Sequence, residues 1–317
     1  MAHGHAHGHA HMSSLDLRRA DSRRRMTAAL AINLVMLGVG VVGGLITGSL
    51  AVLADAGHVL SDVGSIGLGL MAAALAARQA SSRRTFGLQR SEVLAALLNG
   101  LALVAIGVLV IVAAVGRFDD PPDIEGWGVL GIGLFGLAGN LAATWVLARG
   151  DRTDINLEGV LRHSVADALG SLAVVGSGAV ILLTGWVEID PIASIAVALL
   201  ILASSLRLVR EPMDVLMEAA PADLDVDDLA RAVCSTRGVT SVHDLHVWTV
   251  TPGFVALAAH VVVEPHVDRD AARREIEYLL RERYGIEHTT LQMEESAQEG
   301  ALLQLENGLG DGVSAPD

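Results

Sequence analysis

The sequence contains six apolar stretches, and each is long enough to cross a lipid bilayer as a helix. The stretches run approximately over residues 26–48, 50–77, 93–115, 127–148, 160–186 and 192–208. A helix rises about 1.5 Å per residue, so about 20 residues span a hydrocarbon core of about 30 Å. A composition with 52% hydrophobic and only 18% charged residues is wrong for two ordinary soluble domains. The sequence therefore predicts an α-helical membrane domain of six transmembrane helices over residues 26–212.

Arginine residues gather at alternate connections of these stretches, and this pattern predicts the orientation in the membrane. They lie before the first stretch, after the second, after the fourth and after the sixth: Arg18, Arg19, Arg23, Arg24, Arg25; Arg78, Arg83, Arg84, Arg90; Arg149, Arg152; Arg207, Arg210. The remaining two connections are mainly acidic, with Arg117 as the exception. Because positively charged loops remain on the cytoplasmic side, both termini are expected in the cytoplasm, with the chain integral to the cell membrane.

The region after the last apolar stretch has the mixed polarity of a soluble fold. Residues 224–233 and 268–284 have helical periodicity, whereas 242–250, 254–263 and 286–293 are typical of strands. The order α-β-β-α-β predicts a small α+β domain over residues 213–296. Residues 297–317 are polar and are predicted to be disordered.

Charge and cysteine content exclude two classes of partner and site. The formal net charge is −14, and the acidic residues concentrate in the C-terminal third and in two loops, so nucleic acid is not expected as a partner. The lone cysteine, Cys234, excludes a disulfide framework within the chain and a zinc cluster of several cysteines. We interpret it as a packing residue on a reducing, cytosolic side of the membrane.

Ionisable residues inside the second and fifth apolar stretches indicate the chemistry. His58 and Asp62 are four residues apart, and His163 and Asp167 repeat this spacing, so each pair shares one face of a helix. An aspartate at mid-helix costs about 2.5 to 3.5 kcal/mol on insertion scales, which calls for a functional explanation. One such pair alone is more often a hydrogen bond between packed helices, but two copies in one chain favour a joint site.

Two imidazoles and two carboxylates match a tetrahedral Zn(II) site, in which N and O ligands lie at about 2.0 to 2.2 Å. Imidazole disfavours magnesium and calcium, but manganese, iron, cobalt, nickel and cadmium remain chemically compatible. Asp55 lies one turn before His58 and has three candidate roles: a ligand, a proton carrier, or a hydrogen-bond acceptor behind an imidazole. We prefer the last.

These ligands bind metal only when they are deprotonated, so metal and protons compete for the same atoms. A site that faces the two sides of the membrane in turn would therefore exchange protons for metal. The sequence predicts proton-coupled efflux of a divalent metal, zinc first, by alternating access.

Several motifs together resemble the cation diffusion facilitators. They are Asp-x-x-His-x-x-x-Asp at residues 55–62, His-x-x-x-Asp at 163–167, the run 86–96, Asp190-Pro191, and His243-Asp244-Leu245-His246-Val247-Trp248. The similarity extends over about residues 24–295 and implies a homodimer, a ferredoxin-like cytoplasmic domain, and antiport of divalent metal and protons. The histidine in the first motif is similar to the zinc-preferring branch.

The same resemblance implies further metal binding in the cytoplasmic domain, where zinc would act as a regulator. Its candidate ligands here are His243, His260, His288 and Glu294. Strand alternation places His246 on the opposite face from His243, so it is interpreted as a packing residue. The connection of residues 78–85 has no His or Asp, which puts in doubt the metal site that relatives place there.

Residues 1–25 open with a His/Gly/Ala repeat. Its imidazoles, on a chain expected to be flexible, suit weak and rapid metal capture: His3, His5, His7, His9 and His11. The alternative is a purification tag with a junction at His11-Met12. In either case the transport step should not require it.

Two other classes of function compete with export. An intramembrane metalloenzyme would also use zinc, His and Asp, but the sequence has no His-Glu-x-x-His, and four protein ligands leave no open position for a catalytic water. A metal sensor anchored by its helices would not explain ligands buried in two of them. The sequence therefore favours a secondary transporter over an enzyme.

Overall fold

The structure is a computed structural model that describes residues 8–148, 157–295 and 313–314. Side-chain positions are described for residues 27–146, except Ala29, and for 167–295. The chain forms two compact units. The first holds Met1–Met71 and Ala95–Val209, and the second holds Ala72–Leu94 and Arg210–Asp317. Each unit is described by itself.

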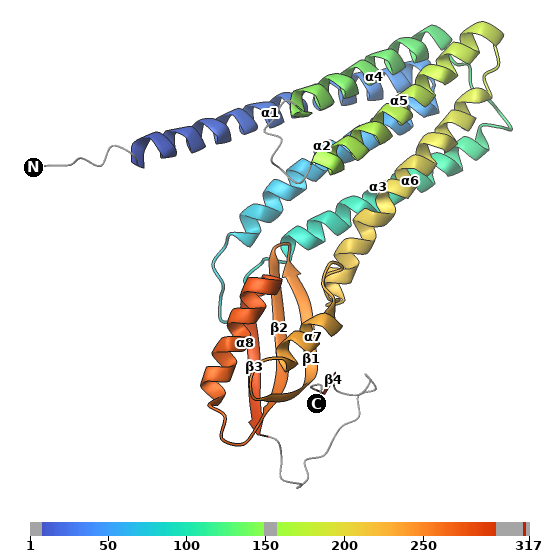
Figure 1. The fold of residues 1–317 in the computed structure, drawn as a ribbon. Helices are drawn as coiled ribbons and strands as arrows, with labels where there is room; N and C mark the ends of the chain where they lie inside the picture. Colours follow the sequence, from blue (N-terminus) through green and yellow to red (C-terminus); the bar gives the residue numbers. More distant parts are fainter. Residues whose placement is uncertain (1–7, 149–156, 296–312, 315–317) are drawn as a thin grey trace, which may run out of the picture. The chain divides into compact units, whose positions relative to one another are not determined.

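Six long helices make up the first unit, and three of them, α2, α3 and α6, also contribute a few residues to the second (Figure 1). Their bounds are α1 Gly8–Thr47, α2 Leu50–Ala76, α3 Ser91–Gly116, α4 Gly126–Ala148, α5 Leu157–Thr184 and α6 Ile189–Leu216. Each contains a window long and apolar enough to cross a membrane, which confirms the six predicted spans. Helix α1 begins at Gly8, so the part of the histidine repeat from Gly8 on is helical and not the flexible chain that we expected.

Small residues allow the helices of the first unit to approach closely. A Cβ at Gly178 of α5 would lie 2.5 Å from the backbone nitrogen of Leu130 in α4, and a Cβ at Gly133 would lie 2.9 Å from that of Val175. Only glycine fits at these crossings without a shift of the neighbouring helix. The abundant glycines of the apolar stretches therefore serve helix packing at these positions.

A buried carboxylate, that of Asp190, connects three helices at one end of the first unit. At this end α1 is followed by α2, and α6 begins. Asp190 is fully buried, accepts hydrogen bonds from the backbone nitrogen of Leu50 (2.8 Å) and the hydroxyl of Ser49, and so caps α2. Arg117, at the end of α3, lies 3.6 Å from Asp190 and donates to the Gly48 carbonyl at 2.6 Å. Asp190 thus holds α2, α3 and α6 together at this end.

Replacing Asp190 by alanine is expected to destabilise the protein by about 2 to 3 kcal/mol, because the cap is lost and the partners of a buried carboxylate are left without it. The thermal midpoint of the purified protein in detergent should fall by about 5 °C. Asp120→Ala, which removes an exposed carboxylate from the α3–α4 connection, should leave the midpoint unchanged. Equal midpoints for both variants would contradict this role of Asp190.

The second unit contains the predicted α-β-β-α-β domain. Its elements are α7 Val226–Cys234, β1 Val239–Thr251, β2 Phe254–Val263, α8 Arg269–Tyr284 and β3 His288–Glu295, with a further short strand, β4 Val313–Ser314. Strands β1 and β2 are antiparallel, β2 and β3 are parallel, and the sheet order is β3-β2-β1-β4. Val313–Ser314 lies in the tail that we predicted to be disordered, so the structure differs from the prediction at these two residues.

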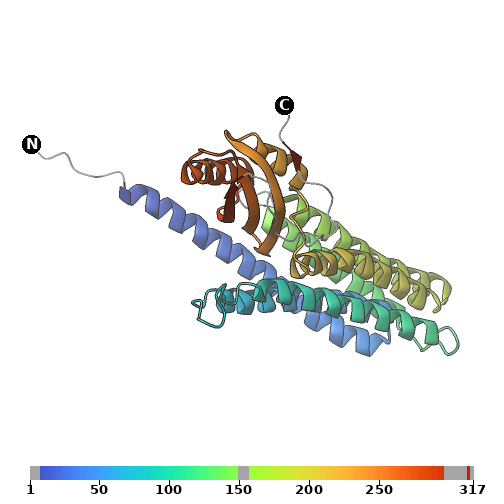
Figure 2. The same ribbon diagram turned by 90° about the horizontal axis from the view of Figure 1, so that it is seen from below.

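Helices α7 and α8 pack on one face of this sheet (Figure 2). Leu229 from α7, Ile276 and Leu280 from α8, and Leu257 and Val261 from β2 are almost completely buried in this core. Cys234 is buried in the same core, and burial raises the pKa of its thiol. The opposite face of the sheet carries the polar side chains described below.

Candidate metal centre

The first cluster of candidate ligands lies between α2 and α5, inside the first unit. His58 Nε2 lies 2.8 Å from Asp167 Oδ1 and 4.0 Å from Asp62 Oδ2. One ligand atom from each of the three residues lies within 4.8 Å of the others, and the three side chains are only 11 to 20% exposed. The structure therefore brings together three of the four predicted ligands. A buried group of one imidazole and two carboxylates can hold a divalent cation.

The helical spacing explains how the two ligand pairs are presented. His58 and Asp62 lie one turn apart on α2, and His163 lies one turn before Asp167 on α5. Side chains four residues apart lie on one face of a helix. His163 is thus on the turn that precedes the cluster, but its side chain is outside the described residues.

Asp55 lies next to this cluster and not among its three members. Its Oδ2 accepts a hydrogen bond from the hydroxyl of Ser171, at 3.5 Å. A Cβ at Gly170 would lie 3.2 Å from Asp55 Oδ1, and one at Gly136 would lie 3.5 Å from Oδ2, so two glycines make room for this carboxylate. One small cavity touches both Asp55 and His58.

Sequence reasoning missed four polar residues around the cluster. The hydroxyl of Ser61 donates to the Asn99 side-chain oxygen, and the Asn140 amide donates to Ser171. The available signal was the cost of an amide inside an apolar stretch, which applies to Asn99 and Asn140 as it does to the carboxylates.

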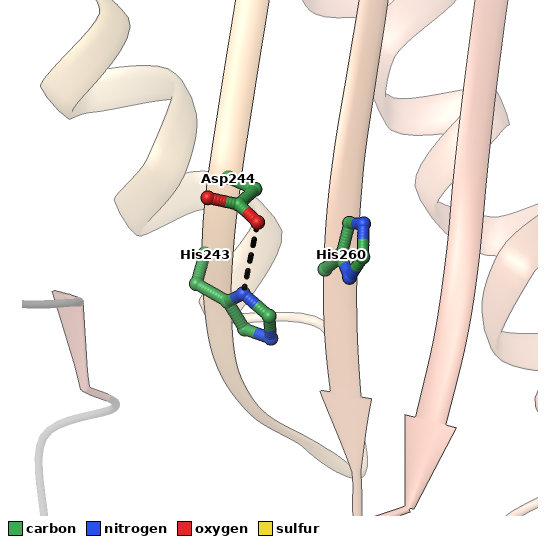
Figure 3. Close-up of side chains that lie close together, drawn as sticks. All are labelled: His243, Asp244 and His260. Atoms are coloured by element: carbon green, nitrogen blue, oxygen red, sulfur yellow. Dashed lines mark ion pairs between the residues drawn. The ribbon is translucent and has the colours of Figure 1, made fainter. Parts of the chain in front are cut away.

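The second cluster lies on the open face of the sheet in the second unit. His243 of β1 and His260 of β2 are paired in register, and their ring centroids are 5.0 Å apart (Figure 3). Glu294 of β3 lies within hydrogen-bond distance of both, at 3.1 Å from His243 Nε2 and 2.7 Å from His260 Nδ1. Three of the four candidates that the resemblance implied thus meet at one point.

The surroundings of Glu294 favour its charged form. Partial burial raises the pKa of its carboxyl, but hydrogen bonds from His260, His243 and Gln292 outweigh that effect and hold the pKa below its ordinary value. A carboxylate between two imidazoles is a donor set that suits zinc. The residues present therefore fit a metal ion here.

Asp244 joins this cluster through a β-bulge that the sequence analysis did not foresee. Between the pairs His243↔His260 and His246↔Ala258, β1 has one residue more than β2, and Asp244 has a positive φ of 48°. The Asp244 carboxylate lies 3.9 Å from His243 Nδ1 (Figure 3). A bulge of this kind re-aims side chains, and Asp tolerates positive φ better than most residues.

The bulge also corrects the prediction for His246. The extra residue shifts the alternation by one, so His246 lies on the same face as His243 and is exposed. The prediction that it points to the opposite face and packs there was wrong.

His288 lies away from the other cytoplasmic candidates. It is paired with Ala256, whereas His260 is paired with Gln292. His288 and Glu294 are thus six residues apart on β3, about 20 Å at 3.3 Å per residue. The His288 ring packs edge-on against Phe254 and Phe86, at centroid distances of 5.4 and 5.8 Å. The structure therefore separates His288 from His243, His260 and Glu294, and our grouping of His288 with these three residues was wrong.

The N-terminal candidates contribute no geometry. His3, His5 and His7 lie outside the described residues, and His9 and His11 lie on α1 with side chains that are not described.

Two family models match the chain. One, described as the cation efflux transmembrane domain, matches residues 26–217, and the other, described as the cytoplasmic domain of cation efflux proteins, matches residues 221–296. The chain belongs to the cation efflux family. This is the family that the motifs resembled, under the name of cation diffusion facilitators. Membership makes it a membrane transporter of a family of exporters and antiporters, and not an enzyme.

Several relatives are similar to this cation efflux protein over most of their length. "Zinc transporter ZitB" of Escherichia coli (strain K12) is 37% identical over 311 residues, which are 98% of this chain and 97% of that protein. "Cadmium, cobalt and zinc/H(+)-K(+) antiporter" of Bacillus subtilis (strain 168) is 40% identical over 261 residues, 81% of this chain and 84% of that protein. "Metal cation efflux system protein CzcD" of Cupriavidus metallidurans is 34% identical over 274 residues, 86% of this chain and 87% of that protein.

Proposed function

We propose that this protein exports a divalent metal, zinc first, from the cytoplasm in exchange for protons, through a site made by His58, Asp62, His163 and Asp167. The observation that carries the proposal is the convergence of α2 and α5, which brings His58, Asp62 and Asp167 together in a buried position. A dication in hydrocarbon needs its charge neutralised, and two carboxylates supply that.

Proton coupling follows from the same residues. The imidazole of His58 already contacts Asp167 at 2.8 Å, so a metal that enters must displace this contact and compete with any proton on it. The name of the Bacillus subtilis relative, an antiporter of cadmium, cobalt and zinc with H(+) and K(+), supports exchange of metal for protons. Asp55, held by Ser171 beside the cluster, is proposed to orient His58 from behind and not to bind the metal.

The identity of the metal is part of the proposal. The names of the Bacillus subtilis and Escherichia coli relatives include zinc, and the former also includes cadmium and cobalt. The proposed ligands here would also suit manganese, iron and nickel. Zinc is preferred because His and Asp ligands in a small tetrahedral site match its coordination. An intramembrane hydrolase is not favoured, because the fourth position would be taken by His163 and not by a catalytic water.

The orientation and assembly also belong to the proposal. We infer that both termini are cytoplasmic, because arginines gather before α1 and after α2, α4 and α6, and positively charged connections stay on the cytoplasmic side. We infer a homodimer, and the match to the cytoplasmic domain of cation efflux proteins supports it, since this is a dimerisation domain in that family. A metal ion held by His243, His260 and Glu294 would regulate the membrane part by ordering the sheet face that they share.

Zinc uptake into inside-out membrane vesicles tests the proposed function. An imposed gradient of one pH unit, acidic inside, should accelerate zinc uptake and should raise the steady-state ratio of zinc inside to zinc outside about tenfold for each proton exchanged per zinc ion. Addition of a protonophore should return the rate to that without a gradient. Vesicles that lack the protein are the control. Uptake that is insensitive to the gradient would contradict antiport, and the absence of zinc uptake would contradict zinc export.

A further inference from the structure

Two asparagine–serine pairs connect the ligand-bearing helices to neighbours that carry no proposed ligand. Ser61, next to Asp62 on α2, donates to Asn99 on α3 at 2.9 Å. Asn140 on α4 donates to the hydroxyl of Ser171 on α5 at 3.0 Å and to the backbone carbonyl of Asp167 at 3.3 Å. Both pairs lie at the turns that present the cluster.

These hydrogen bonds differ from those that a side-chain hydroxyl makes to the backbone of its own helix. The hydroxyl of Thr144 donates to the Asn140 carbonyl one turn earlier on the same helix, at 2.7 Å. Such a bond satisfies the hydroxyl and fixes nothing between helices. The Asn140 amide, by contrast, is only 9% exposed and uses its bonds to hold α5. A buried amide of this kind fixes the relative position of two helices.

The Asn140–Ser171 pair reaches across to α2 as well. The hydroxyl of Ser171, which is fully buried, accepts from Asn140 and donates to Asp55 at 3.5 Å. One network therefore runs from α4 through α5 to α2, one turn away from His58. The separation of α2 and α5 sets the size of the space between His58, Asp62 and Asp167.

We propose that Asn140 and Ser171 are positioning residues that determine metal selectivity by fixing the spacing of α2 and α5. The inference rests on the proposed function. Zinc binds at short ligand distances, whereas the larger cadmium ion needs a wider group of ligands. A network that resists separation of the helices disfavours cadmium relative to zinc, because selectivity among such metals is set by geometry more than by intrinsic affinity.

The ratio of the half-saturation concentrations for zinc and cadmium transport tests this inference. Flux of each metal is measured on the same proteoliposomes under the same pH gradient, for the wild type, Ser171→Ala, Asn140→Leu and the double variant. Each single variant should shift the ratio about fivefold towards cadmium, the effect of one buried hydrogen bond. The double variant should shift it no further, because the two residues act as a unit.

The chain offers a matched control for each substitution. Ser177→Ala removes a buried hydroxyl from α5 that has no hydrogen-bond partner within the part of the chain that the structure describes. Thr144→Ala removes a hydroxyl from α4 that bonds only within its helix in the described contacts. Both should keep the wild-type ratio. Equilibrium binding of zinc and cadmium in detergent supplies the same ratio for any variant that does not reconstitute.

The outcomes separate this inference from the function on which it rests. An unchanged ratio in Ser171→Ala and Asn140→Leu, or an equal loss for both metals, would overturn the positioning role while export stands. A shift of the same size in Ser177→Ala would also overturn it. Absence of flux for every metal in the wild type would overturn the proposed function itself.

Discussion

Asp167→Ala is expected to lower the initial rate of zinc flux in proteoliposomes by about 100-fold or more. Loss of a residue that supports a metal ligand typically costs 10- to 100-fold, and loss of a ligand itself should cost at least as much. Asp167 also contacts His58 at 2.8 Å, so its removal leaves the imidazole without this carboxylate and leaves the incoming dication with one negative charge fewer. Asp62→Ala and His163→Ala should have the same effect, because each removes one of the four proposed ligands.

Two further variants separate loss of the site from loss of the fold. Asp167→Asn keeps the size and much of the hydrogen bonding but removes the charge, and it should be as inactive as Asp167→Ala. Asp119→Ala removes an exposed carboxylate outside the cluster and should transport zinc at the wild-type rate. Elution of each variant as a single species in size-exclusion chromatography verifies folding. Flux near the wild-type rate in Asp167→Ala would refute a metal site at this position.

The membrane part could be predicted from the sequence because its signals are local. The length of an apolar run decides whether a helix crosses the bilayer, so six spans follow from composition alone. The i, i+4 spacing of His58 with Asp62 fixes a shared face, and the cost of burying such groups implies that the two ligand-bearing helices meet. The hydrogen-bond partners of Asn140 were out of reach, since no local rule identifies Ser171 as its neighbour.

The second cluster illustrates where local rules fail. Strand alternation assigned His246 to the wrong face, because one extra residue at Asp244 reverses the alternation that follows it. The placement of His288 failed for a related reason: two residues on one strand share a face at any even spacing, and only the register with β2 shows that His288 lies opposite Ala256. Bulges and registers depend on the partner strand and are not encoded in one strand's pattern.

Glu294→Gln is expected to weaken zinc binding at the second cluster, formed by His243, His260 and Glu294, about 10- to 100-fold. The carboxylate is the group that both His243 and His260 contact, at 3.1 and 2.7 Å, and its pKa is held below the ordinary value by these hydrogen bonds. A neutral amide of the same size keeps the packing but removes the negative charge that attracts the metal. Binding is measured by zinc titration of the full-length protein in detergent, with the Asp167→Ala substitution in every sample to remove the membrane site.

Glu295 provides the matched control for this measurement. It is the next residue on β3, lies 2.7 Å from Arg269 in an ion pair, and points to the other face of the strand. Glu295→Gln therefore changes the net charge as Glu294→Gln does, yet it should leave zinc affinity unchanged. If both variants bound zinc as tightly as their parent, the zinc would be bound at another site. If both lost zinc affinity equally, the affinity would depend on the net charge and not on Glu294. A loss confined to Glu294→Gln assigns the metal to the open face of the sheet, where His243 and His260 meet.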